Sequence, residues 1–312
     1  MRASFARTLA VTSSAAPATG RLSLLVWLCL AAVYFVWGST YLAIRFALVA
    51  YPPLFFPGVR FIAAGSILMI ALRLRGHPLP TLKQFGRAGM IGFLLLNIGN
   101  GAVVYAQRDV GSALAATAVA TMPLWASLFG GIWGVWPKRM QWLGLAVGFS
   151  GIVLLNVDGD FAANPLSAAL LIAASMSWAF GSVWSRRLDL PYGAMSTACQ
   201  MLSAGVLFLI ASAAAGESWQ LVTTPKAMAA VAHLTVFGSV VAFSAYMYLN
   251  QTVSPSLATS YAYVNPVVAL LLGALLGGEL FVANELAAIV LVLSGVLLIV
   301  LNNRSPSAAK SA

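Results

Sequence analysis

The chain has 312 residues, of which 61% are hydrophobic and only 8% are charged, whereas soluble domains average about 25% charged residues. Its 17 basic and seven acidic side chains are too few to cover a water-soluble globular protein. The net charge of +10 does not indicate nucleic-acid binding, because the basic residues are scattered between apolar runs. The composition therefore predicts an integral membrane protein whose main partner is the lipid bilayer.

Apolar segments of spanning length follow one another along the chain, since a helix needs about 20 residues to cross the hydrocarbon. Turn residues and charges separate them, and the connections are too short for a soluble domain. We therefore predict an all-α integral membrane fold with ten transmembrane helices. The predicted spans are 24–48, 54–74, 88–107, 113–136, 141–157, 166–187, 194–215, 228–250, 256–278 and 284–301.

The two ends of the chain are more polar. Residues 1–22 contain three Arg and no acid, a composition shared by transit peptides and cytoplasmic tails. The apolar run that follows is long enough to span and lacks an A-x-A cleavage site, so we expect a cytoplasmic tail there. A second cytoplasmic tail is predicted at 302–312.

The basic residues predict the orientation. With a cytoplasmic N-terminus, 13 of the 17 Lys and Arg lie in cytoplasmic segments, and only Arg108 and Lys226 lie outside. Arg45 and Arg60 fall within spans. This asymmetry follows the positive-inside rule, so both termini of this multi-pass inner-membrane protein should be cytoplasmic.

The first half of the sequence is repeated in the second. The segment Gly111–Pro123 aligns with Ser254–Pro266 at an offset of 143 residues, and Ser150-Gly151 aligns with Ser294-Gly295 at 144. A repeat with an odd number of spans enters the membrane in opposite senses, which is typical of secondary transporters that alternate access. The two predicted repeats, each of five spans, are residues 24–157 and 166–301.

Several segments resemble one family. They are Trp37 through Tyr41, Gly58 through Phe61, Ser177 through Ser182 and Ser254 through Pro266. Together they are similar to the EamA family of the drug/metabolite transporter superfamily, and within it to the YedA-like bacterial branch. The resemblance covers residues 24–301. It implies ten transmembrane helices and the export of small metabolites, amino acids or xenobiotics.

Polar and large aromatic side chains meet at one level near the middle of the predicted spans. An amide or an indole N–H costs several kcal/mol in hydrocarbon unless it faces a cavity or a partner. Hydrogen bonds between helices, core packing and interface belts are the alternatives for individual members. The predicted substrate-binding residues are Trp37, Asn97, Asn100, Trp178, Tyr248, Tyr263 and Asn265.

Such a lining, without a deep carboxylate, favours zwitterionic or neutral-to-cationic amphipathic solutes over polyanions. Pro123 and Pro266 lie beside it at matched positions of the repeats. Each removes one backbone donor and frees a carbonyl, so we expect a gating role, with a purely structural kink as the alternative.

Two charges near the outer side of the membrane are predicted to pair. Arg60 lies several residues below the outer end of the second span, where an unpaired guanidinium is expensive, and Glu279 ends the ninth span. A structural ion pair of Arg60 with Glu279 is the favoured interpretation, and a substrate-carboxylate clamp at Arg60 is the alternative. Arg45 lies closer to the surface and can extend its charge toward water.

Small residues also predict one helix contact. Gly144 and Gly148 form a small-xxx-small step on the fifth span, and Ser294-Gly295 gives the tenth span a similar notch. We expect these two helices to pack closely, with a homodimer seam as the alternative use of this face.

No motif for metal, nucleotide or hydrolytic chemistry occurs in the sequence, and Cys29 and Cys199 lie singly within apolar runs. We therefore expect no cofactor, no metal and no enzymatic activity. The favoured function is an inner-membrane secondary transporter that exports small organic molecules by alternating access. An intramembrane enzyme acting on lipid intermediates and a passive channel or scaffold are the alternatives.

Overall fold

The computed structural model describes residues 23–134, 136–155, 164–219, 224–253, 260–280 and 283–302. Within these ranges every regular element is a helix. Helices satisfy all backbone hydrogen bonds inside one segment, as the bilayer requires. The predicted tail 1–22 and all but the first residue of the tail 302–312 fall outside the described residues.

The first half of the chain contains five helical rods, and two of them pass through a π-helical turn (η1 and η2). Its elements are α1 (Leu24–Ala31), η1 (Ala32–Trp37), α2 (Gly38–Leu48), α3 (Phe55–Leu74), α4 (Leu82–Gly92), η2 (Phe93–Asn100), α5 (Gly101–Ala106), α6 (Ser112–Val119), α7 (Met122–Gly130), the short 3₁₀ turn η3 (Gly131–Trp133) and α8 (Arg139–Leu155).

The second half repeats this sequence of long helices, with one π-helical segment (η4). Its elements are α10 (Pro165–Ser185), α11 (Ala194–Ala214), α12 (Pro225–His233), η4 (Leu234–Val241), α13 (Ala242–Thr252), α15 (Tyr261–Gly277) and α16 (Ala283–Asn302).

Seven helical rods are long and apolar enough to cross a membrane, which confirms seven predicted spans as helices of spanning length. The predicted spans 141–157, 256–278 and 284–301 correspond to α8, α15 and α16, which are also helical. That all ten cross the bilayer stays a prediction. The seven rods are Leu24–Leu48, Phe55–Leu74, Leu82–Ala106, Ser112–Trp133, Pro165–Ser185, Ala194–Ala214 and Pro225–Leu249.

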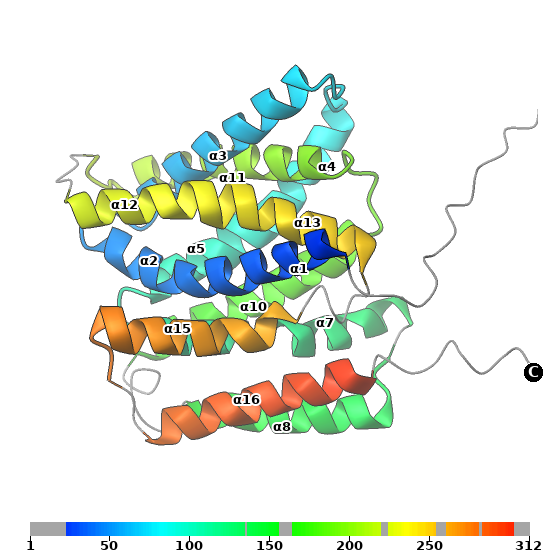
Figure 1. Ribbon diagram of the computed structural model, residues 1–312, viewed down its shortest axis with the longest axis vertical. Coiled ribbons are helices and arrows are strands. Elements are labelled where there is room, and N and C mark those ends of the chain that lie inside the picture. The colour runs from blue at the N-terminus through cyan, green and yellow to red at the C-terminus, as the bar shows by residue number, and fades with distance from the viewer. Residues whose placement is uncertain are drawn as a thin grey trace, which may run out of the picture.

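The two halves of the chain interlock rather than lie side by side. α11 of the second half packs along α3 of the first, and α15 packs against both α2 and α6. Figure 1 shows α3, α4 and α11 at one edge of the bundle and α8 with α16 at the other. The space between these edges is therefore surrounded by helices of both halves.

The predicted contact between α8 and α16 is confirmed. A Cβ atom at Gly295 would lie 2.5 Å from the Gly144 carbonyl oxygen and 2.6 Å from the Gly148 Cα, so the two backbones touch. Only glycines allow so close an approach. Figure 1 shows the two helices side by side along their length. This glycine face is thus used within one chain, which removes the argument for a homodimer seam on it.

The three π-helical segments lie around the middle of the bundle. π-turns inside α-helices change which carbonyls are free and are frequent at functional sites. The Gly238 carbonyl in η4 accepts the Trp37 Nε1–H at 3.0 Å, and Ser239 in the same turn accepts from Arg60 Nε at 2.9 Å. η4 therefore orients one indole and one guanidinium at the centre of the protein.

Candidate functional site: a central cavity between the repeats

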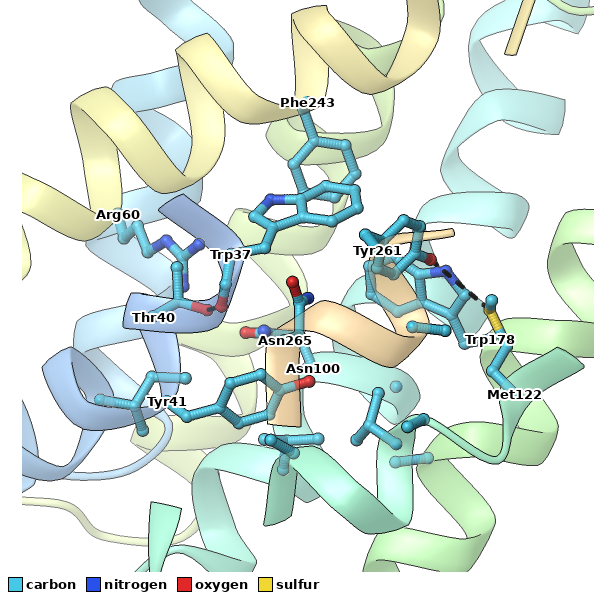
Figure 2. A pocket seen from close by; sticks show the side chains of 18 residues that line it. Trp37, Thr40, Tyr41, Arg60, Asn100, Met122, Trp178, Phe243, Tyr261 and Asn265 are labelled. Atoms are coloured by element: carbon cyan, nitrogen blue, oxygen red, sulfur yellow. Dashed lines mark hydrogen bonds between the residues drawn. The ribbon is translucent and has the colours of Figure 1, made fainter. Parts of the chain in front are cut away.

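A cavity lies at the centre of the bundle. Its walls come from the first half of the chain through η1, α2, α3, η2, α5, α6 and α7, and from the second half through α10, α13 and α15. Figure 2 shows the side chains that converge on it. The polar and aromatic members of the lining are Trp37, Thr40, Tyr41, Arg60, Asn100, Trp178, Phe243, Tyr261 and Asn265.

Four predicted binding residues line this cavity, namely Trp37, Asn100, Trp178 and Asn265. The structure thus brings together side chains from four helical rods that are far apart in the sequence. The prediction that they share one cavity combined their depth, the matched prolines and the cost of an unpaired amide or indole N–H in hydrocarbon. None of these says which way a given side chain faces.

Asn97 and Tyr248 do not line the cavity. Asn97 donates its Nδ2–H to the Ala204 carbonyl of α11 at 3.0 Å. Because Phe93–Asn100 is π-helical, with hydrogen bonds between residues five apart, the step from Asn97 to Asn100 stays well short of a full turn. Tyr248 packs against the main apolar core instead. The side chain of Tyr263 lies outside the described residues.

The two indoles of the cavity differ in how they are held. Trp37 is fixed by its bond to Gly238 and by ring contacts with Phe243 and Tyr261, with centroids 5.1 and 5.0 Å away. Trp178 lies 6.4 Å from Trp37 between ring centroids, and its buried Nε1–H has no protein partner. An indole that lines a cavity and keeps a free N–H can donate to a bound solute.

The two amides also differ. The Oδ1 atom of Asn100 is buried and has no protein partner. Asn265, in the amide orientation that its neighbours require, donates to the Tyr34 carbonyl at 3.1 Å and to the Tyr261 carbonyl at 3.3 Å. Asn265 therefore joins α15 to η1, whereas Asn100 offers a free acceptor.

The two prolines border the cavity at matched positions but differ locally. Pro266 lies inside α15, as predicted. Pro123 is the second residue of α7, so it begins a new helix after a break at residues 120–121 rather than kinking a continuous one. Neither proline can donate to the carbonyl four residues earlier. Those carbonyls belong to Val119 and Ala262, which both line the cavity.

Arg60 reaches the cavity from α3. The residue is only 3% exposed, its Nε donates to Ser239 Oγ at 2.9 Å, and its guanidinium lies 4.8 Å from the centroid of the Phe61 ring. Its Nη1 atom is buried without a protein partner. One edge of the guanidinium is therefore anchored, and the other is free.

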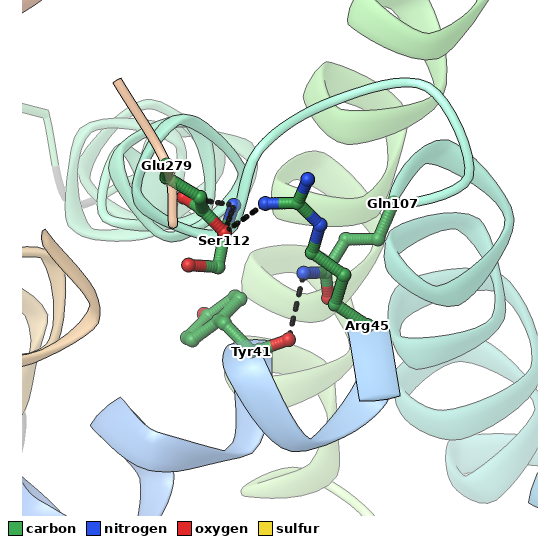
Figure 3. A network of polar contacts seen from close by, with 5 residues as sticks. All are labelled: Tyr41, Arg45, Gln107, Ser112 and Glu279. Atoms are coloured by element: carbon green, nitrogen blue, oxygen red, sulfur yellow. Dashed lines mark hydrogen bonds and ion pairs between the residues drawn. The ribbon is translucent and has the colours of Figure 1, made fainter. Parts of the chain in front are cut away.

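The predicted ion pair of Arg60 with Glu279 is wrong, because Glu279 pairs with Arg45 at 2.5 Å. Both carboxylate oxygens of Glu279 also lie 3.0 Å from the backbone N–H of Ser112, at the start of α6. Arg45 is in the last turn of α2, and that turn, the start of α6 and the end of α15 meet at one place (Figure 3). Arg60 follows the connection after α2 and enters from another helix, α3.

A second polar contact supports the same end of the bundle. Gln107 donates its Nε2–H to the Tyr41 carbonyl at 2.8 Å, and both residues are buried. Figure 3 shows this bond beside the Arg45–Glu279 pair. The contact of Arg45, Glu279 and Ser112, here named the end latch, thus joins α2, α6 and the end of α15.

Sequence reasoning missed several members of the lining. Thr40 and Tyr41 follow Trp37 by three and four residues, and Tyr261 precedes Asn265 by four. Residues three or four apart share a helix face, so this spacing is the signal that could have found them. Phe243 stands at the repeat offset of 143 from Asn100, which is a second usable signal.

A family model, a related protein and a solved structure each match this chain. The model of the EamA-like transporter family matches residues 23–157 and 165–301. The uncharacterized inner membrane transporter YedA of Escherichia coli (strain K12) is 47% identical over 271 residues, which cover 86% of this chain and 89% of that protein. A solved crystal structure, 20% identical, covers 90% of this chain and 98% of its own with a TM-score of 0.64. The resemblance predicted from the sequence is thereby confirmed.

A more distant relative carries a more specific name. It is the probable terminal-alkyne amino-acid exporter of Streptantibioticus cattleyicolor, 28% identical over 289 residues, which cover 89% of this chain and 94% of that protein. The likeness to the solved structure supports the fold alone, while the matched family supports membrane transport.

Proposed function

Because the chain belongs to the EamA-like transporter family, we propose that this membrane transporter is an inner-membrane carrier that exports small organic metabolites. Amino acids and amphipathic drugs are the solute classes that suit a cavity with this lining. The relative named as an amino-acid exporter supports the first class. The observation that carries the proposal is the central cavity, because both halves of the chain build its walls.

The proposed mechanism is alternating access between two inverted repeats of five spans each, with both termini in the cytoplasm. Helices of the two repeats interlock around the cavity, as α15 does between α2 and α6. A small rotation of one repeat against the other would therefore open one end of the cavity while the other end closes.

The proposed moving parts are the segments where helical hydrogen bonding is interrupted. These are the break before Pro123, the turn at Pro266 and the π-helical segments η1, η2 and η4, all of which border or adjoin the cavity. Interrupted segments bend at lower cost than a regular helix. The end latch is the proposed closing contact of the outer end, because it joins α15 of the second repeat to α2 and α6 of the first.

The test is transport by the purified protein in proteoliposomes. Labelled amino acids and the toxic cation tetraphenylphosphonium are offered with and without a pH gradient. We expect saturable uptake of at least one solute, and a loss of about tenfold or more in Trp178→Ala and Asn265→Ala, since each removes a lining group. If the uptake depends on the pH gradient, transport of the solute is coupled to protons.

The matched control is Trp142→Ala, because Trp142 is 49% exposed on α8, away from the cavity. It should transport like the wild type. If the cavity variants reach the membrane and transport with unchanged affinity and rate, the cavity is not the solute site and the proposed carrier mechanism fails.

A further inference from the structure

Arg60 is a buried cation whose charge the described protein leaves uncompensated. Its one hydrogen bond is to a neutral hydroxyl, that of Ser239, and its ring neighbour is Phe61. Its Nη1 atom is buried without a partner and the residue lines the cavity. A guanidinium in this position is costly unless an anion faces it.

The carboxylates whose side chains the structure describes are engaged elsewhere. Glu279 binds Arg45, Asp189 lies 3.5 Å from Arg87, and Asp109 accepts from Ser167 at 2.9 Å. Glu217 accepts the backbone N–H groups of residues 54 and 55. Among the described acids none therefore faces the cavity, and an anionic solute that enters it would compensate the charge of Arg60.

The chemistry of the guanidinium selects the anion. A carboxylate accepts the parallel N–H groups of arginine in a planar fork, and such charge-assisted bonds are about twice as strong as neutral ones. A phosphate or another polyanion would need several cations, whereas Arg60 is the one Lys or Arg among the described residues that line the cavity. A single carboxylate is thus the matching group.

The wall opposite Arg60 is aromatic. Figure 2 shows Arg60 at one side of the cavity, Trp178 at the other and the amides of Asn100 and Asn265 between them. Phe243 lies 6.1 Å from Trp178 between ring centroids and extends this apolar surface. The free Asn100 Oδ1 accepts a hydrogen bond, so it can take an N–H of the solute.

We infer that the transported solutes carry one carboxylate and an aromatic or large apolar body, and that Arg60 binds the carboxylate while the aromatic wall holds the body. This inference rests on the proposed function and names its substrate class. An amino acid with an aromatic side chain has all three parts: its carboxylate can face Arg60, its ammonium can donate to Asn100, and its ring can pack on the aromatic wall.

The first measurement compares three probes with the same phenyl ring, one of which lacks the ammonium and one the carboxylate, by calorimetric titration of the wild-type protein in detergent. The probes are L-phenylalanine, 3-phenylpropionate and L-phenylalaninamide. We expect the two carboxylates to bind about tenfold or more tightly than the amide, since a charge-assisted bond to a buried group is lost in the amide. This comparison does not depend on any variant folding.

The second measurement removes the guanidinium. Arg60→Gln should weaken the two carboxylates about tenfold or more and leave the amide within about twofold. Arg60→Lys keeps the charge but not the planar pair of N–H groups, so its affinity for the carboxylates should lie between those of the wild type and Arg60→Gln. Arg87→Gln is the control, because Arg87 pairs with Asp189 outside the cavity. If Arg60→Gln does not fold, Ser239→Ala removes the anchor of the guanidinium and should weaken the carboxylates selectively.

The outcomes separate this inference from the proposed function. If the wild type binds the amide as tightly as L-phenylalanine, or if Arg60→Gln weakens all three probes equally, the carboxylate role of Arg60 is wrong. If in addition Trp178→Ala abolishes transport of tetraphenylphosphonium, the carrier proposal still stands. Failure of every probe to bind and of every offered solute to be transported would reject both.

Discussion

The two repeats share their backbone features and differ in the side chains that they give to the cavity. Pro123 matches Pro266 at an offset of 143 residues. Each proline leaves the carbonyl four residues earlier without its helical N–H donor, and these carbonyls, on Val119 and Ala262, stand at the same offset. The glycines of α8 and α16 meet at a seam that belongs to both repeats. The internal symmetry thus preserves the parts that bend and the parts that pack.

The lining does not follow this symmetry. Asn265 in the second repeat stands where the first repeat has Met122, and Asn100 in the first stands where the second has Phe243. All four residues line the cavity, so each polar group has an apolar counterpart. The comparison shows how a symmetric scaffold can hold a solute in one orientation, with its polar end toward Arg60 and its apolar body toward the aromatic wall.

The largest expected effect tests whether the repeats are inverted. Val49 and Tyr192 stand at the repeat offset, follow the first helix of each repeat, and are 79% and 85% exposed. We expect Val49→Cys to react with a membrane-impermeant maleimide from outside intact cells and Tyr192→Cys to react only after lysis. The background variant has Cys29→Ser and Cys199→Ser, both buried thiols. Labelling of both sites from one side would break the inverted repeat.

The second largest expected effect is a loss of stability at the glycine contact between α8 and α16. Gly295→Ala places a methyl group against the backbone of α8, and overpacking of this kind costs about 1–3 kcal/mol. The melting temperature in detergent should therefore fall by several degrees, because the free energy of unfolding is lower. Gly86→Ala is the matched control, because nothing lies within 4 Å of a Cβ atom there and the residue is helical. Equal melting temperatures would mean that α16 can move away from α8.

A third test exchanges a polar residue for its counterpart in the other repeat. Asn265→Met copies Met122, removes the hydrogen bonds to the Tyr34 and Tyr261 carbonyls, and keeps a side chain that is unbranched at Cβ. Loss of such buried bonds costs about 1–3 kcal/mol, and we expect a comparable loss of solute affinity. Calorimetric titration with L-phenylalanine checks it. The reverse change Met122→Asn should not restore binding, and restoration would show that the lining is functionally symmetric.

Much of this architecture was predictable, because it depends on local chemistry. Apolar length gives the spans, and the repeat gives the matched prolines and the notch at Gly295. Depth and the cost of an unpaired amide or indole N–H together indicated that Trp37, Asn100, Trp178 and Asn265 share one cavity, and all four line it. Each of these arguments uses only the position of a residue along its own helix, which the sequence contains directly.

The predictions were wrong where the outcome depends on which way a side chain points around its helix, or on which helices are in contact. Asn97 faces α11 because its turn is π-helical, and no residue pattern distinguishes a π-turn from an α-turn. Glu279 selects Arg45 over Arg60 because the ends of α2 and α15 meet, which depends on how distant helices pack. The helix break before Pro123 has the same origin.

The smallest expected effect concerns the end latch, where the repeats are again unequal partners. Glu279 comes from the second repeat and is 4% exposed at its side chain, whereas Arg45 of the first is 42% exposed and therefore partly screened by solvent. Glu279→Gln keeps one acceptor for the Ser112 N–H and loses the charge, so we expect the free energy of unfolding to fall by only about 1 kcal/mol.

If the end latch closes the outer end of the cavity, the same variant should also speed labelling of Ile44→Cys by a maleimide added from outside. Ile44 lines the cavity and is next to Arg45 in the chain. Asp189→Asn, which breaks the exposed pair with Arg87, should change neither measurement. Unchanged labelling in Glu279→Gln would reduce the latch to a structural contact and leave the cavity's outer closure to the packing of its apolar walls.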